Sequence, residues 1–252
     1  MPETVPTYCV VGATGGIGAA LCRRLAQRRA NLLIAAREEG RLAGLTGELS
    51  ALGSRVLSHP LDATRSEEVN AAVAAAVNEF GRIDGAVNLV GSILLKPAHL
   101  TTDAEFEQTL TLNTRTAFYL LRAAAKAMME SGSGSIVLVS TVAASIGLPN
   151  HEAIAAAKGA INGLVRSAAA TYASRGIRVN GVAPGLVRTP LASKITSNEL
   201  ALKASIAMHP LGRIGEPDDI ASAVEWLLDP ANSWVTGQML GIDGGLSTVR
   251  GK

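Results

Sequence analysis

Residues 151–158 read His-Glu-Ala-Ile-Ala-Ala-Ala-Lys and carry two side chains able to handle protons. His151 and Lys158 are seven residues apart, nearly two turns of the helix that this alanine-rich stretch predicts, so both would project from about the same face. Histidine exchanges a proton near neutral pH. The stretch therefore predicts a proton-handling site. The alternative is that His151 only begins the helix, near a subunit contact, with Glu152 as a first-turn acid that complements the helix dipole.

A glycine-rich loop, GATGGIG at residues 12–18, follows an apolar run and opens a helical pattern. Glycines at Gly12, Gly16 and Gly18 allow a tight turn and a close approach of the backbone to a phosphate. The helix that starts there offers free N–H groups and a partial positive charge. The loop predicts a dinucleotide-phosphate site, against the alternative of a helix-start turn that binds nothing.

Short apolar runs alternate with longer helical segments along the whole chain, which predicts an α/β fold. The expected architecture is a doubly wound Rossmann fold, with a parallel sheet of about seven strands and helices on both faces. We expect one long helix over residues 103–130 and a single domain over residues 1–252. Residues 185–215 form a long irregular region, where a substrate-binding lid is expected.

Composition argues against several classes of partner. The net charge is +2 and aromatic residues make up 3 % of the chain, which does not favour nucleic-acid binding. No uncharged run is long and apolar enough for a membrane span, and the N-terminus does not resemble a signal peptide. Two cysteines in apolar surroundings suit a reducing, cytoplasmic location. The arginines at positions 23, 24, 28 and 29 are read as a solvated helix face rather than a basic patch.

At the glycine loop the chain resembles the short-chain dehydrogenase/reductase family, whose fingerprint is Thr-Gly-x-x-x-Gly-Ile-Gly. Val11 stands at the threonine position of that fingerprint. The segments LDAT, VNLVG, LNTRTAF, VNGVAPGLVRT, HPLGRIGEPDDIA and VTGQMLGIDGG extend the resemblance over nearly the whole chain. VNLVG keeps the first asparagine and the glycine of the family's Asn-Asn-Ala-Gly but changes the middle. By this resemblance the cofactor-binding residues are Gly12, Thr14, Gly16, Ile17, Gly18, Asp62, Asn88, Lys158, Pro184, Gly185 and Thr189.

The end of the second apolar run indicates which dinucleotide is preferred. In this fold an acid at that place accepts hydrogen bonds from the ribose hydroxyls and repels a 2′-phosphate. Here the position is Ala36, and Arg37 follows it. A guanidinium can pair with a phosphate through two parallel hydrogen bonds, so NADP(H) is favoured over NAD(H). The alternative is that Arg37 only pairs with Glu38 or Glu39.

The family's reaction uses a tyrosine as proton donor, a lysine four residues later, a serine and an asparagine. The resemblance implies that Lys158, Asn113 and Thr141 fill the last three roles, whereas Ile154 stands at the tyrosine position. Threonine keeps the hydroxyl of the serine. The enoyl reductase branch of the family uses a wider tyrosine–lysine spacing, which His151 matches. None of the three tyrosines, at positions 8, 119 and 172, is placed to substitute.

The sequence thus predicts an oxidoreductase that transfers a hydride between NADP(H) and a small carbonyl or activated C=C substrate, with an altered proton donor. Water, His151 or Lys158 could supply the proton. The alternative is a catalytically inactive NADP(H)-binding protein that acts as a sensor or partner subunit. The helices near Asp103 and His151 resemble those of the family's subunit interface, so a homotetramer or homodimer is expected. No metal site is predicted, and the substrate cannot be read from the sequence.

Overall fold

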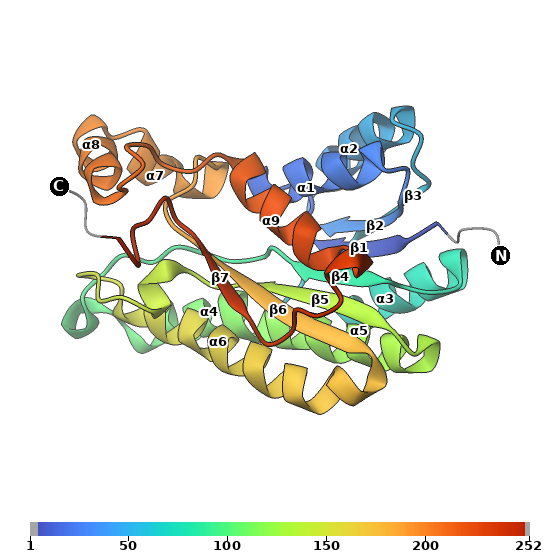
Figure 1. Ribbon diagram of the computed structural model, residues 1–252. Helices are drawn as coiled ribbons and strands as arrows, with labels where there is room; N and C mark the ends of the chain where they lie inside the picture. The colour runs from blue at the N-terminus through green and yellow to red at the C-terminus, as the bar shows by residue number, and fades with distance from the viewer. Residues whose placement is uncertain (1–4, 250–252) are drawn as a thin grey trace.

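A seven-stranded parallel sheet forms the centre of the computed structural model, which describes residues 5–249 (Figure 1). The strand order is β3-β2-β1-β4-β5-β6-β7. The strands are β1 (Thr7–Val11), β2 (Asn31–Ala36), β3 (Val56–Pro60), β4 (Gly85–Asn88), β5 (Gly134–Val139), β6 (Ile177–Pro184) and β7 (Met239–Ile242). The order reverses between β1 and β4, and ligands of open α/β sheets bind beyond the carboxyl ends of the strands at such a point.

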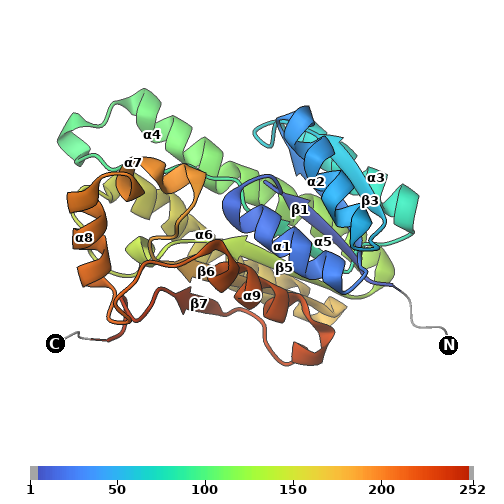
Figure 2. The same ribbon diagram turned by 90° about the horizontal axis from the view of Figure 1, so that it is seen from above.

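Helices cover both faces of this sheet, as Figures 1 and 2 show. The helices are α1 (Gly16–Gln27), α2 (Glu39–Ala51), α3 (Ser66–Phe80), α4 (Asp103–Leu110), α5 (Thr116–Ser131), α6 (Glu152–Tyr172), α7 (Ser193–Thr196), α8 (Glu199–Met208) and α9 (Pro217–Leu228). One core packs α1, α2 and α9 on one face, and a second core packs α3, α5 and α6 on the other. The doubly wound fold expected from the alternating pattern is confirmed.

Alternating side chains of the central strands feed the two cores. On β1, Cys9 and Val11 join the core of α3, α5 and α6, whereas Tyr8 and Val10 join the core of α1, α2 and α9. All four are buried, because a strand in the middle of a covered parallel sheet has no solvated face. This explains why the strands appear in the sequence as continuous apolar runs.

The long helix predicted over residues 103–130 is interrupted by one π-helical turn, Thr111–Arg115, between α4 and α5. Asn113 lies in this turn, and its amide nitrogen donates to the carbonyl of Thr109 at 2.9 Å. A side chain that bonds a carbonyl of the preceding turn widens the helix locally, and such π turns are frequent at functional sites. The single-helix prediction was wrong at this turn, which contains the predicted asparagine.

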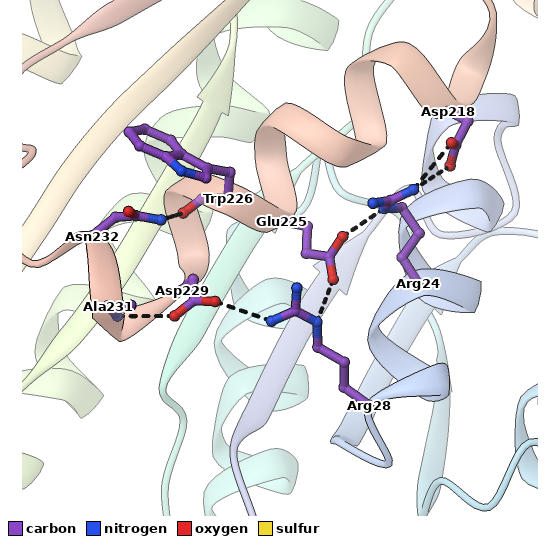
Figure 3. Close-up of polar contacts among 8 residues, drawn as sticks. All are labelled: Arg24, Arg28, Asp218, Glu225, Trp226, Asp229, Ala231 and Asn232. Atoms are coloured by element: carbon purple, nitrogen blue, oxygen red, sulfur yellow. Dashed lines mark hydrogen bonds and ion pairs between the residues drawn. The ribbon is translucent and has the colours of Figure 1, made fainter.

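Arg23, Arg28 and Arg29 are exposed, as the interpretation of a solvated helix face predicts. The sequence did not reveal that this face also forms ion pairs with α9. Arg24 and Arg28 both donate to the carboxylate of Glu225 on α9, each at 2.5 Å (Figure 3). The Glu225 side chain is only 7 % exposed, so this carboxylate is buried between two guanidinium groups. Arg24 also pairs with Asp218 and Arg28 with Asp229, each at 3.0 Å. The cluster joins α1 to α9.

The predicted lid, residues 185–215, contains α7 and α8 and lies beyond the carboxyl ends of the strands (Figure 1). The long segment therefore has helical structure of its own, as the sequence indicated. The predicted single domain spans residues 1–252, and its ends at residues 1–4 and 250–252 lie outside the described residues. Within residues 5–249 no helix is both long and apolar enough to cross a bilayer.

Candidate functional site

The glycine loop joins β1 to α1 at the carboxyl edge of the sheet. Gly12 has a φ of +85°, a left-handed conformation that favours glycine. A Cβ on Gly18 would lie 2.3 Å from the carbonyl oxygen of Gly12, so the turn closes only with glycine there. No side chain caps the N-terminus of α1, and its first turn contains no acidic residue. The first N–H groups of α1 are therefore available to an anion, and a dinucleotide pyrophosphate fits this cradle.

The end of β2 carries the predicted ribose-binding residues. β2 ends at Ala36, and the exposed Arg37 pairs with no described carboxylate. Glu38 pairs instead with Arg41, at 3.5 Å, which removes one argument against a role of Arg37 in binding. Arg41 also donates to the carbonyl of Thr14 in the glycine loop at 2.5 Å. The sequence analysis did not single out Arg41. Its position in the first turn of α2, shortly after the end of β2, could have indicated that it lies near the glycine loop.

Asp62 lies directly after β3, at the same edge of the sheet. Its Oδ1 accepts hydrogen bonds from the main-chain N–H and the hydroxyl of Thr64, at 2.9 and 2.8 Å. These bonds, with the charge of Arg37 as a smaller contribution, hold the pKa of Asp62 below its ordinary value. The carboxylate is thus ionised and fixed in direction beside Arg37.

Asn113 has its side-chain amide fully engaged and is completely buried. Its Oδ1 accepts from the main-chain N–H of Ser92 at 3.1 Å, and its Nδ2 donates to the Ser92 hydroxyl at 2.9 Å. A Cβ on Gly91 would lie 2.8 Å from Asn113 Oδ1 and 3.5 Å from Lys158 Nζ. The loop after β4 therefore runs between Asn113 and Lys158, and the structure brings these two predicted residues together.

Lys158 is buried in α6, with 8 % of its surface exposed. Its ammonium group donates to the carbonyl of Val139 at 2.8 Å, and no described carboxylate pairs with it. Burial lowers the pKa of Lys158 from 10.5 to about 8. An ammonium group has three donors, so two remain for a ligand. A titratable group shifted in this way is typical of functional sites.

The remaining predicted catalytic residues lie around the ends of β5 and α6. Thr141 follows β5, and its Oγ1 accepts from the N–H of Ala143 at 3.4 Å, which leaves its own O–H proton to donate. Ile154, one turn before Lys158, is buried. His151 is the N-cap residue of α6, and its Nδ1 lies 2.7 Å from the carbonyl oxygen of Pro149. No hydrogen bond joins His151 to Lys158 among the described residues, so the structure does not pair them.

Further predicted cofactor residues lie beside the glycine loop. A Cβ on Gly16 would lie 2.9 Å from Cγ2 of Thr189, so the start of the lid contacts the loop. Ile17 follows Gly16 in the first turn of α1. Asn88 ends β4 next to Val11, and its buried Oδ1 has no hydrogen-bond partner among the described residues. Pro184 ends β6, and Gly185 donates its N–H to the carbonyl of Ile242 at 3.1 Å.

A cavity of about 1020 Å³ lies at the opposite edge of the sheet, where Tyr8, Arg178 and Trp234 are among its lining residues. None of the predicted site residues lines this cavity, and none of its lining residues belongs to the glycine loop. Tyr8 lies there, and its burial raises its pKa to about 12. The glycine loop, Asn113 and Lys158 lie instead at the carboxyl edge of the sheet, which is the candidate site. Among residues 5–249, no group of three or more potential metal ligands occurs.

Similarity to known proteins covers nearly the whole chain, including the residues described above. The family model described as Enoyl-(Acyl carrier protein) reductase matches residues 12–247. An A-factor type gamma-butyrolactone 1′-reductase from Streptomyces virginiae is 38 % identical over 246 residues, which cover 95 % of this chain and 95 % of that protein.

Solved structures agree with the sequence relatives. A short-chain type dehydrogenase/reductase from Mycobacterium ulcerans superposes with a TM-score of 0.93 at 34 % identity, covering 98 % of this chain and 91 % of the other. A tyrosine-to-phenylalanine variant of ElxO with NADPH bound superposes with a TM-score of 0.91 at 27 % identity, covering 97 % of this chain and all of the other.

Proposed function

Because the chain belongs to the short-chain dehydrogenase/reductase family, we propose that it transfers a hydride between NADP(H) and a small carbonyl or activated C=C substrate. The observation that carries the proposal is Lys158, a buried ammonium group without an ion-pair partner among the described residues, next to Asn113 and the loop that follows β4. Burying an unpaired charge is costly, and such a cost is typical of a group kept for chemistry or ligand binding.

NADP(H) is favoured by the charges at the ribose end of the site. Ala36 offers no carboxylate to a ribose, and Arg37 and Arg41 flank the start of α2. Two guanidinium groups suit a 2′-phosphate, since each can donate paired hydrogen bonds to it. The neighbouring ElxO variant was solved with NADPH although a tyrosine had been replaced by phenylalanine, so in that protein the cofactor binds without that hydroxyl.

We assign the proton to Lys158 Nζ rather than to His151. When bound, the dinucleotide supplies or accepts the hydride. Lys158 has a pKa of about 8, so its ammonium form is present at neutral pH and gives up a proton readily. In carbonyl reduction the proton passes from Nζ to the substrate oxygen, and solvent restores it. Thr141 donates a hydrogen bond to the same oxygen and stabilises its developing charge.

The inactive NADP(H)-binding protein remains the second candidate, and Ile154 is the observation that favours it. This buried isoleucine stands where the family has its proton-donating tyrosine. Loss of a general acid typically slows a reaction about 10²- to 10⁴-fold without abolishing it. NADPH consumption with a panel of ketones, quinones and enones separates the two candidates. Tight NADPH binding without turnover on any substrate would reject the enzyme.

We also propose a homotetramer or homodimer that packs through α4, α5 and α6. Three large apolar side chains on these helices, Phe106, Phe118 and Met129, are 38–43 % exposed. Light scattering after gel filtration tests the assembly, and a monomer at micromolar concentration would contradict it. A cytoplasmic location fits Cys9 and Cys22, which are both buried and unpaired.

A further inference from the structure

His209 is buried at a junction of three segments, with only 3 % of its surface exposed. It follows α8 directly, at the end of the predicted lid. The ring lies against the turn at Gly185 that follows β6, and its Cβ lies near Gly244 after β7. A histidine in a lid is usually solvated, so its burial here calls for a physical reason.

The hydrogen bonds of the ring specify one protonation state. Nδ1 lies 2.6 Å from the carbonyl oxygen of Ser205, which can only accept, so Nδ1 must carry a proton. Nε2 lies 3.2 Å from the main-chain nitrogen of Leu186, which can only donate, so Nε2 must be unprotonated. Only the neutral ring satisfies both partners. A second proton on Nε2 would place two donors opposite each other in a buried position.

Gly185 provides the space for this contact. A Cβ at this position would lie 2.5 Å from His209 Nε2 and 3.2 Å from Cδ2. The imidazole therefore occupies the place that any other residue at position 185 would need. The ring joins the last turn of α8 to the turn that carries Pro184 and Gly185, which the family uses at the nicotinamide.

Three charged groups lie around the ring. Asp243 is next to it, but both of its carboxylate oxygens already accept hydrogen bonds from Gly245 and Ser247. Burial raises the pKa of Asp243, but these bonds outweigh that effect and leave the pKa below its ordinary value. Arg213 and Asp219 share a cavity of about 120 Å³ with His209 and pair with each other at 2.6 Å. No described carboxylate oxygen is left as the evident acceptor for a second ring proton.

We propose that His209 is a positioning residue that fastens the end of the lid to the Gly185–Leu186 turn through the unprotonated Nε2 of its neutral ring. Loss of this acceptor releases the end of α8 from the cofactor edge. The effect of this release on catalysis rests on the proposed function. The attachment itself does not.

Hydrogen exchange of residues 193–208, followed by mass spectrometry on the full chain without cofactor, tests the proposal. Exchange is measured at pH 7.5. His209→Gln keeps an acceptor near the position of Nε2. His209→Leu fills the same space but offers Leu186 no acceptor. His99→Gln, at an exposed histidine, is the matched control.

In His209→Leu we expect lid exchange about tenfold faster than in the wild type, as loss of one buried hydrogen bond implies. In His209→Gln and His99→Gln the exchange should stay close to the wild-type rate. A wild-type rate in His209→Leu overturns the proposal. Fast exchange in His209→Gln also overturns it, even if His209→Leu does not fold.

Added NADPH separates this proposal from the proposed function. If the cofactor binds, it should slow exchange in residues 12–18 as well as in the lid. A chain that shows no NADPH protection but keeps the difference in lid exchange between His209→Leu and His209→Gln would reject the cofactor and leave the role of His209 intact. With an identified substrate, release of the lid should raise KM more than it lowers kcat.

Discussion

The ammonium group of Lys158 donates to the main-chain carbonyl of Val139 at 2.8 Å. The adjacent Ser140 hydroxyl donates in return to the carbonyl of Lys158 at 3.0 Å. These two bonds fix α6 against the carboxyl end of β5, and they hold the lysine in a buried position. The lysine is thereby directed at the site without help from a tyrosine.

Lys158→Met should stabilise the fold while it weakens cofactor binding. The folded-state pKa of about 8 is below the ordinary 10.5, so between these values the unfolded chain binds more protons and stability rises with pH. Below pH 8 the full cost of the buried charge is present, about 3 kcal/mol. Denaturant unfolding should show a gain of up to about 3 kcal/mol at pH 7 that vanishes near pH 10.5. NADPH affinity, measured by fluorescence, should fall at least about tenfold.

The pH profile of turnover should identify the proton donor. If the Lys158 ammonium gives the proton, the rate of carbonyl reduction falls as pH rises through about 8, because the lysine then loses its proton. His151→Gln should change kcat by less than about threefold, since His151 serves as the N-cap residue of α6. A loss of about 10²-fold or more in His151→Gln would assign the proton to the histidine instead.

Ile154→Tyr should raise ketone reduction. The new hydroxyl would stand one helical turn from Lys158, where the family has its proton donor, and the expected gain is about 10²-fold in kcat/KM. The larger ring should cost about 1–3 kcal/mol of stability, since Ile154 is buried. Ile154→Phe supplies the ring without the hydroxyl and is the control. Equal activity of the two variants would show that the hydroxyl does not reach the substrate.

Arg37→Ala and Arg41→Ala should each raise the Kd for NADPH about tenfold and leave that for NADH nearly unchanged. Ala36→Asp should go further and reverse the preference, since a carboxylate accepts from both ribose hydroxyls and repels the phosphate. Arg55→Ala, at an exposed arginine before β3 that pairs with Glu79, controls for the loss of one positive charge. A similar loss of NADPH and NADH binding in the arginine variants would refute a phosphate contact.

Glu225→Gln should destabilise the fold by about 2–3 kcal/mol, because it leaves two guanidinium groups facing a neutral, buried amide. This loss of unfolding free energy is less than for a fully buried pair, because the side chains of Arg24 and Arg28 are 32 % and 58 % exposed. Glu48→Gln breaks an exposed pair with Arg23, in which both side chains are more than 40 % exposed, and should cost less than about 1 kcal/mol. Equal losses of unfolding free energy would mean that burial of Glu225 contributes nothing.

The sequence predicted the layers of this fold well, because burial on both faces of a parallel sheet leaves a clear apolar pattern. Two features that depart from this pattern could not be predicted from the sequence, for physical reasons. The π turn at Asn113 arises from a side-chain bond to Thr109, which helical periodicity does not reveal. The partners of Arg24 and Arg28 lie about 200 residues away, so no local pattern predicts them.

The sequence indicated which residues belong to the candidate site but not the contacts that they form. Glycine spacing located the tight turn between β1 and α1, since such a turn depends on consecutive backbone positions. The neighbours of Arg41 and His209 come from separate loops, so their roles became visible only in three dimensions. The hydrogen bond from Lys158 to β5 could not be predicted either, because its acceptor is a main-chain carbonyl 19 residues away.

The bridge from α1 to α9 bears on the order in which the chain can fold during synthesis. Glu225 is made about 200 residues after Arg24, so the side of α1 that packs against α9 stays uncovered until nearly the whole chain has left the ribosome. Contacts between such distant segments form slowly, since a long loop must close first. A chain halted before residue 217 would leave this side of α1 exposed, and chaperones should bind that species.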